Sequence, residues 1–118
     1  MSTAKLPPKV QQYLKQMDDL QKTYASIVSQ KQQLQMTLLE IKNALDALSK
    51  VSDEGEVYKL IGSIFFKTSK KNVVEELEEN KEILEARIKT LELQEKRIIE
   101  ELNKLRAEVS KYLSQPPS

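Results

Sequence analysis

Charged side chains are the first candidates for chemistry in this sequence, because histidine and cysteine are both absent. Their absence removes the commonest general base, the commonest metal ligand, and every disulfide or thiolate. Most of the 18 acidic residues are spread along charged helical stretches, which offer no cleft that could activate a carboxylate. An enzyme is therefore the weakest functional hypothesis. We expect no catalytic residue, no metal site and no cofactor.

Phosphate-binding chemistry is also poorly supported. The two glycines, Gly55 and Gly62, are both explained by turns, and there is no glycine-rich phosphate loop. The net charge is +1, and acidic residues are interleaved with the 19 basic ones. This pattern is typical of a solvated helix surface, whereas nucleic-acid binding requires a concentrated basic face. A nucleic-acid-binding helical arm is kept only as a minor alternative.

Contacts between apolar side chains are the chemistry that remains, and a seven-residue repeat arranges them. Apolar residues recur every three then four residues in two stretches of the chain. In the first stretch the repeat occupies Val10, Tyr13, Met17, Leu20, Tyr24, Ile27, Lys31, Leu34, Leu38, Ile41, Leu45 and Leu48. In the second it occupies Val74, Leu77, Lys81, Leu84, Ile88, Leu91, Glu95, Ile98, Leu102, Leu105, Val109 and Tyr112. A period of 3.5 residues over this length predicts two long helices that supercoil around each other.

Proline, glycine and capping residues set the expected bounds of the helices. Pro7 and Pro8 can open the first helix, which we expect over residues 8–52 with a stop at Gly55. The second helix is expected over residues 69–113, starting at Ser69 or at Asn72. Residues 114–118 form a short tail. The whole chain, residues 1–118, is expected to be one domain.

The segment between the two helices, residues 56–68, differs in kind. Two short runs of β-branched and aromatic residues are split by Gly62 and Ser63, a pair that favours a tight β-hairpin turn. The pleat places Val57 and Ile61 on one face of the first strand, and Tyr58 and Leu60 on the other. In the second strand Ile64 and Phe66 share a face, and Phe65 lies opposite.

A hairpin with apolar groups on both faces is marginal alone in water, and it leaves two strand edges unpaired. We therefore expect the chain to form an oligomer in which these strands pair with strands of other subunits. The expected contacts are made by Val57, Tyr58, Leu60, Ile61, Ile64, Phe65 and Phe66. The alternative is a hairpin folded back onto its own helices.

The reversal between the helices makes the coiled coil antiparallel. The two registers agree, since each expected layer has residue numbers with the same sum, as in Met17 with Leu105 and Leu34 with Ile88. This register places the polar seam residues Lys31 and Glu95 one helical turn apart, within reach of an ion pair. We expect this polar layer to fix the register, and a site for a partner or substrate is the alternative.

Further apolar residues gather near the free ends of the helices: Leu6, Val10, Tyr13, Leu14, Val109, Tyr112 and Leu113. Leu14 and Leu113 lie beside the seam and widen it. Such an end is expected to contact other apolar chains. Simple packing of the coiled-coil end is the alternative. Since no stretch approaches the ~20 apolar residues that span a bilayer, a soluble cytoplasmic protein is expected.

The arrangement of helix, single hairpin and helix resembles the archaeal type of the prefoldin beta subunit family. The resemblance covers essentially the whole chain. Its most specific part is Val57-Tyr58-Lys59-Leu60-Ile61-Gly62 followed by Ile64-Phe65-Phe66-Lys67-Thr68, and Gln30-Lys31-Gln32-Gln33-Leu34 also fits. A single hairpin is typical of the beta class.

The resemblance implies a chaperone that acts without ATP. It also implies a hexamer of two alpha and four beta subunits, in which the hairpins join into a double β-barrel. The distal tips, here Leu6 to Met17 and Leu105 to Leu113, would hold non-native proteins and pass them to a group II chaperonin. Met17 and Leu105 therefore join the expected client-binding residues. A passive coiled-coil scaffold or tether is the main alternative.

Overall fold

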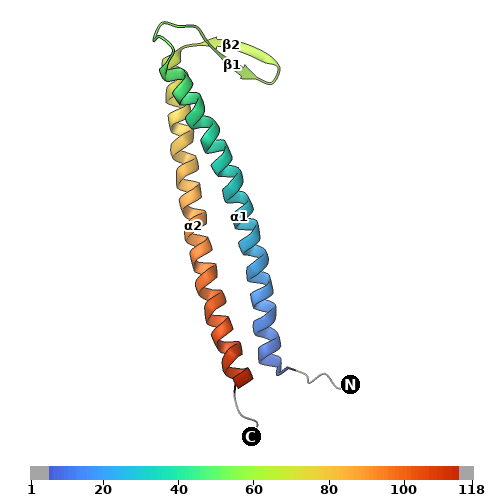
Figure 1. Cartoon of the computed structure of the whole chain (residues 1–118). Coiled ribbons are helices and arrows are strands. Elements are labelled where there is room, and N and C mark those ends of the chain that lie inside the picture. The colour runs from blue at the N-terminus through green and yellow to red at the C-terminus, as the bar shows by residue number, and fades with distance from the viewer. Residues whose placement is uncertain (1–5, 115–118) are drawn as a thin grey trace. The chain divides into compact units, whose positions relative to one another are not determined.

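The structure, a computed structural model, describes residues 6–114. Helix α1 (Pro8–Ser49) is followed by strands β1 (Val57–Ile61) and β2 (Ile64–Thr68), and then by helix α2 (Lys70–Ser114) (Figure 1). The expected fold class, two long helices with one β-hairpin between them, is confirmed. The described residues group into two compact units, which we call the terminal unit (6–30 and 91–114) and the hairpin unit (31–90).

Both helices run without interruption because neither contains an internal proline or glycine beyond Pro8 in the first turn of α1. Helix α1 ends before the expected residue 52. Its end is tightened, since the amides of Lys50 and Val51 donate to carbonyls three residues earlier at 3.2 and 3.1 Å. Helix α2 begins at Lys70, so of the two expected starting residues Ser69 is the one that precedes and caps the helix. Its hydroxyl accepts the Asn72 N–H at 3.1 Å and so caps the helix.

The core of the terminal unit consists of seam residues. Ile27 of α1 and Ile98 and Leu102 of α2 are buried together. The half-buried residues packed against them are Met17, Leu20, Tyr24 and Leu91. All seven are positions of the predicted repeat, which confirms the seam in this unit. The rings of Tyr13 and Tyr112 lie 6.3 Å apart at a tilt of 60°, a common aromatic pairing geometry.

The hairpin unit follows the same repeat. Ile41 and Ile88 are buried, and the remaining seam residues of this unit are half-buried: Lys31, Leu34, Leu38, Leu45, Leu48, Val74, Leu77, Lys81 and Leu84. Lys31 belongs to this unit and Glu95 to the terminal unit. Both are half-buried, and the ion pair between them stays a prediction.

Strands β1 and β2 pair antiparallel, with Ile61 opposite Ile64 and Leu60 opposite Phe65. This register confirms the predicted faces. Gly62 and Ser63 form the turn, and Gly62 has a φ of +61° while no other described residue has a positive φ. A positive φ at only the first turn position is the signature of a type II′ turn, whose twist suits a hairpin.

Replacing Gly62 with alanine is expected to destabilise the hairpin by about 1 kcal/mol, because an L-residue is strained at positive φ. Steric crowding adds nothing, since no atom lies within 4 Å of the place of a Cβ at Gly62. Chemical denaturation followed by circular dichroism measures the effect. Ser63→Ala is the control, and equal midpoints for the two variants would contradict the turn assignment.

Candidate interaction surfaces

Six apolar side chains of the hairpin project into solvent and define what we call the hairpin surface: Tyr58, Leu60, Ile61, Ile64, Phe65 and Phe66. Their exposed fractions run from 48% for Phe66 to 69% for Phe65. Val57, the seventh predicted contact residue, is only 9% exposed and packs inside the hairpin unit. An apolar cluster of this size on a small protein is typical of an interaction site.

Both faces of the hairpin contribute to this surface. Ile61, Ile64 and Phe66 lie on one face, and Tyr58, Leu60 and Phe65 on the other. Because all six are exposed, the alternative of a hairpin folded back onto its helices is wrong for this part of the hairpin. The sheet of the described chain has two strands only, so the outer edge of each strand is unpaired. The surface therefore offers apolar side chains and free backbone hydrogen-bonding groups together.

A lysine anchors the hairpin to helix α2. The Lys59 ammonium contacts both oxygens of the Glu76 carboxylate, at 2.6 and 2.8 Å. Lys59 is the middle residue of β1 and lies on the same face as Val57, so this solvent-exposed ion pair and the burial of Val57 connect the first half of β1 to the hairpin unit. At the same end, Glu56 accepts a hydrogen bond from the Tyr58 hydroxyl at 3.0 Å. The polar contacts gather at the base and leave the tip of the hairpin to apolar residues.

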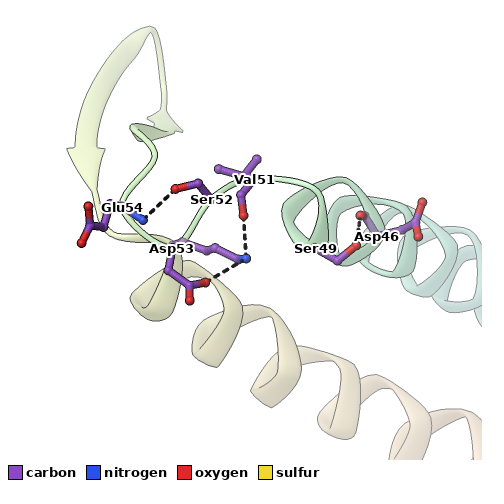
Figure 2. A network of polar contacts seen from close by, with 7 residues as sticks. Asp46, Ser49, Val51, Ser52, Asp53 and Glu54 are labelled. Carbon is purple, nitrogen blue, oxygen red and sulfur yellow. Dashed lines mark hydrogen bonds and ion pairs between the residues drawn. The ribbon is translucent and has the colours of Figure 1, made fainter.

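The loop that leads from α1 into β1 is held by polar contacts (Figure 2). The Lys70 ammonium donates to the Val51 carbonyl at 2.7 Å and to the Asp53 carboxylate at 3.2 Å. The Lys70 side chain is only 18% exposed, so its bond to the Val51 carbonyl is partly shielded from water, whereas the Asp53 carboxylate lies in solvent. The Ser52 hydroxyl accepts the Glu54 N–H at 3.2 Å, an ordinary serine turn. Lys70 thus joins the start of α2 to the loop before β1.

Close packing favours glycine at position 55 of this loop. A Cβ at this position would lie 2.7 Å from Val51 Cγ1 and 3.0 Å from the Ser52 carbonyl oxygen. The Gly55 N–H also donates to that carbonyl at 2.9 Å. The loop therefore turns tightly between α1 and β1, where the sequence predicted a stop.

At the ends of the terminal unit the nine predicted tip residues divide into two groups. Val10 is fully buried, and the half-buried ones are Tyr13, Met17, Leu105, Val109 and Tyr112. Leu6, Leu14 and Leu113 are exposed, Leu113 to 66%, and we call these three the terminal surface. The packed group corresponds to the end-packing alternative. The exposed group remains available for contact with another chain.

Sequence reasoning passed over four exposed apolar side chains on the outer faces of the helices: Met36, Leu39, Ile83 and Leu93. Their signal was present in the sequence, since each lies away from the seam positions of the repeat. Arg106 was also missed, although it borders two hollows of the terminal unit. No sequence pattern marks such a position, because it depends on how the flanking side chains pack.

Ionisable groups give little sign of a reactive centre. The Asp18 carboxylate, 3.0 Å from the Lys22 ammonium, raises the pKa of Lys22 above its ordinary value. This lysine is a cation at neutral pH in either case. Over residues 6–114, no group of three or more acidic side chains is placed to hold a metal ion. Neither described helix has a segment long and apolar enough to span a membrane.

Two long helices joined by one exposed hairpin define a chain whose recognisable sites are contact surfaces. Residues 11–115 match the family described as Prefoldin subunit. Prefoldin subunit beta of Thermococcus kodakarensis is 40% identical over 111 residues, covering 94% of this chain and 95% of the relative. The corresponding protein of Archaeoglobus fulgidus is 38% identical over 109 residues, covering 92% and 94%.

The same similarity extends to solved structures. The crystal structure of the prefoldin beta subunit from Thermococcus strain KS-1 is 39% identical and aligns with a TM-score of 0.89, covering 97% of this chain and 100% of that one. The chain belongs to the prefoldin beta subunit family. It is therefore a non-enzymatic, chaperone-type subunit, and the resemblance seen in the sequence is confirmed.

Proposed function

We propose that this chain is a holdase subunit that binds non-native proteins without ATP and passes them to a group II chaperonin. The observation that carries the proposal is the terminal surface, where Leu6, Leu14 and Leu113 are exposed beside a seam that is already packed. Apolar contact is non-directional, so it suits unfolded clients of many sequences. The packed tip residues would support this surface from the seam side. They are the buried Val10 and the half-buried Tyr13, Met17, Leu105, Val109 and Tyr112.

Assembly through the hairpin surface is the second part of the proposal. The relatives are named as beta subunits, which fits a hetero-oligomer with an alpha subunit. We propose a cytoplasmic hexamer of two alpha and four beta chains, with the hairpins of the subunits joined into a β-barrel. The exposed side chains and unpaired edges described above supply both the apolar contacts and the backbone hydrogen bonds that such a barrel needs. The helical ends would then remain free for client and chaperonin.

Native mass spectrometry of the chain recovered from its own cells tests the assembly. The proposal expects four copies with two copies of a second subunit. A lone monomer or a simple homodimer would contradict it and would favour a passive tether, which needs no exposed hairpin surface.

Client binding is tested by replacing Leu14 and Leu113 with serine. We expect assembly to persist, while roughly tenfold more chaperone is needed to suppress light scattering by an aggregating client, because about 1.4 kcal/mol of apolar contact is removed. Leu39→Ser with Leu93→Ser is the matched control, since these leucines are also exposed on helices. Unchanged scattering with the first pair would move the client site elsewhere.

A further inference from the structure

Two hollows on one flank of the terminal unit meet at Arg106. The first has a volume of about 390 Å³ and is lined by Met17, Arg106, Val109, Ser110, Leu113 and Ser114. The second has a volume of about 270 Å³ and is lined by Gln21, Tyr24, Ile99, Leu102, Asn103 and Arg106. Because both are lined by α1 and α2 and share Arg106, they form one shallow groove, which we call the Arg106 groove.

The charge of this groove is unbalanced. Among the described residues, no acidic side chain lines either hollow, and Arg106 is its one charged group. Within residues 6–114 the Arg106 guanidinium has no carboxylate within ion-pair distance. Its one hydrogen bond runs from Nη1 to the Asn103 side-chain oxygen at a long 3.5 Å. Most of its five N–H donors are thus available to an incoming acceptor.

The other flank of the same unit differs. There a hollow of about 430 Å³ is lined by Gln16, Asp19, Leu20, Glu101, Lys104 and Leu105. Its lysine shares the hollow with two acids, so this flank has no unbalanced positive charge. The chain therefore contains its own comparison, because Arg106 lies in a groove with no other charged group among the described residues, whereas Lys104 of the same helix lies beside two carboxylates.

The dimensions of the Arg106 groove fit a short extended peptide. Its α2 residues run from Ile99 to Ser114, which corresponds to about 22 Å of helix and to about seven residues of extended chain. Apolar side chains lie toward both ends, Ile99 at one and Val109 with Leu113 at the other. Arg106 lies between them.

We propose that the Arg106 groove binds segments of non-native protein in which a side-chain carboxylate is flanked by apolar residues. This deepens the proposed holdase function and rests on it. The apolar ends of the segment contact Ile99, Val109 and Leu113, and the carboxylate accepts charge-assisted hydrogen bonds from the Arg106 guanidinium. Planar guanidinium donors match the two oxygens of a carboxylate. The chain would therefore prefer clients with isolated Glu or Asp in apolar runs.

Blocked peptides test the preference. Three peptides are compared by fluorescence anisotropy on the full chain in its native assembly, each with a central Glu, Gln or Lys between pairs of leucines. Acetylated and amidated ends leave the side chain as the only carboxylate. We expect the Glu peptide to bind about fivefold more tightly than the Gln peptide, as a partly exposed ion pair of about 1 kcal/mol implies. The Lys peptide should bind least tightly, and added salt should narrow the difference.

Variants at Arg106 and Lys104 test whether the preference for the Glu peptide arises in the Arg106 groove. Arg106→Gln is expected to bind the Glu and Gln peptides equally, whereas Arg106→Lys keeps a smaller preference, because the ammonium retains the charge but not the planar donors. Lys104→Gln, with the same change of charge on the other flank, should leave the preference intact. A Glu preference that persists in Arg106→Gln, a wild type with no preference, or no binding of any peptide would each overturn the proposal.

The same preparations separate this inference from the proposed function. If the assembly suppresses aggregation of an unfolded client but shows no Glu preference, the holdase function stands and the groove proposal fails. If it neither suppresses aggregation nor binds a peptide, both fail. Circular dichroism of Arg106→Gln checks that its helices are intact.

Discussion

Replacing Ile61 and Phe65 with lysine is expected to dissociate the assembly while the helices stay folded. Both side chains are more than half exposed in the described chain, so two lysines there disturb little of the packing within one subunit. In an assembled barrel the same positions would be buried. Each lysine then removes about 1.5–3 kcal/mol of apolar burial and adds the cost of desolvating a charge, which weakens association by more than about 100-fold.

Native mass spectrometry and analytical ultracentrifugation measure this change, with circular dichroism to follow helix content. The matched control places lysines at Met36 and Ile83, which are also exposed in the hairpin unit but lie on the helices. That control should assemble normally. An unchanged mass for the Ile61 and Phe65 variant would rule out the hairpin surface as the assembly site.

Replacing Leu102 with alanine is expected to have the largest effect on folding. Leu102 is 7% exposed and packs with Ile27 and Ile98 in the core of the terminal unit. Truncation of a buried leucine leaves a cavity and costs about 2–4 kcal/mol. The coiled-coil seam is thin, so few neighbouring side chains can move to fill the space. Urea denaturation followed by circular dichroism should show a clearly lower midpoint.

Leu93→Ala provides the control for that experiment. Leu93 is 53% exposed on the same helix, and alanine is the better helix former, so we expect a change within about 0.5 kcal/mol. Similar midpoints for the two variants would show that the seam is not the main source of stability in this unit.

The repeat made most of the fold predictable. Its period fixed which residues face the partner helix, and every seam position is buried or half-buried in its own unit. The hairpin was predictable because Gly62 and Ser63 separate two short runs of β-branched and aromatic residues. The end of α1 was not, because it is set by the tightened bonds of Lys50 and Val51. The bonds from Lys70 to the loop join residues 17 and 19 positions apart, which no local pattern records.

For the candidate surfaces the sequence was less decisive. All nine apolar residues near the chain ends were predicted as contact residues, although only Leu6, Leu14 and Leu113 are exposed. The distinction follows from the repeat, since Val10, Tyr13 and Tyr112 occupy seam positions, whereas Leu14 and Leu113 lie beside them. Among the described residues Arg106 is the only charged one that lines its groove, and the sequence does not show which side chains of the two helices border that groove. That information is tertiary.

The exposure of the hairpin surface has a consequence for how the protein must be produced. A single copy presents six large apolar side chains and two open strand edges to solvent. These are the features by which misfolded proteins adhere to one another. A copy synthesised in excess of its partners would therefore itself be a candidate for aggregation or degradation. The cell would therefore have to make this subunit and its partners in matching amounts, because the exposed hairpin surface needs a partner to cover it.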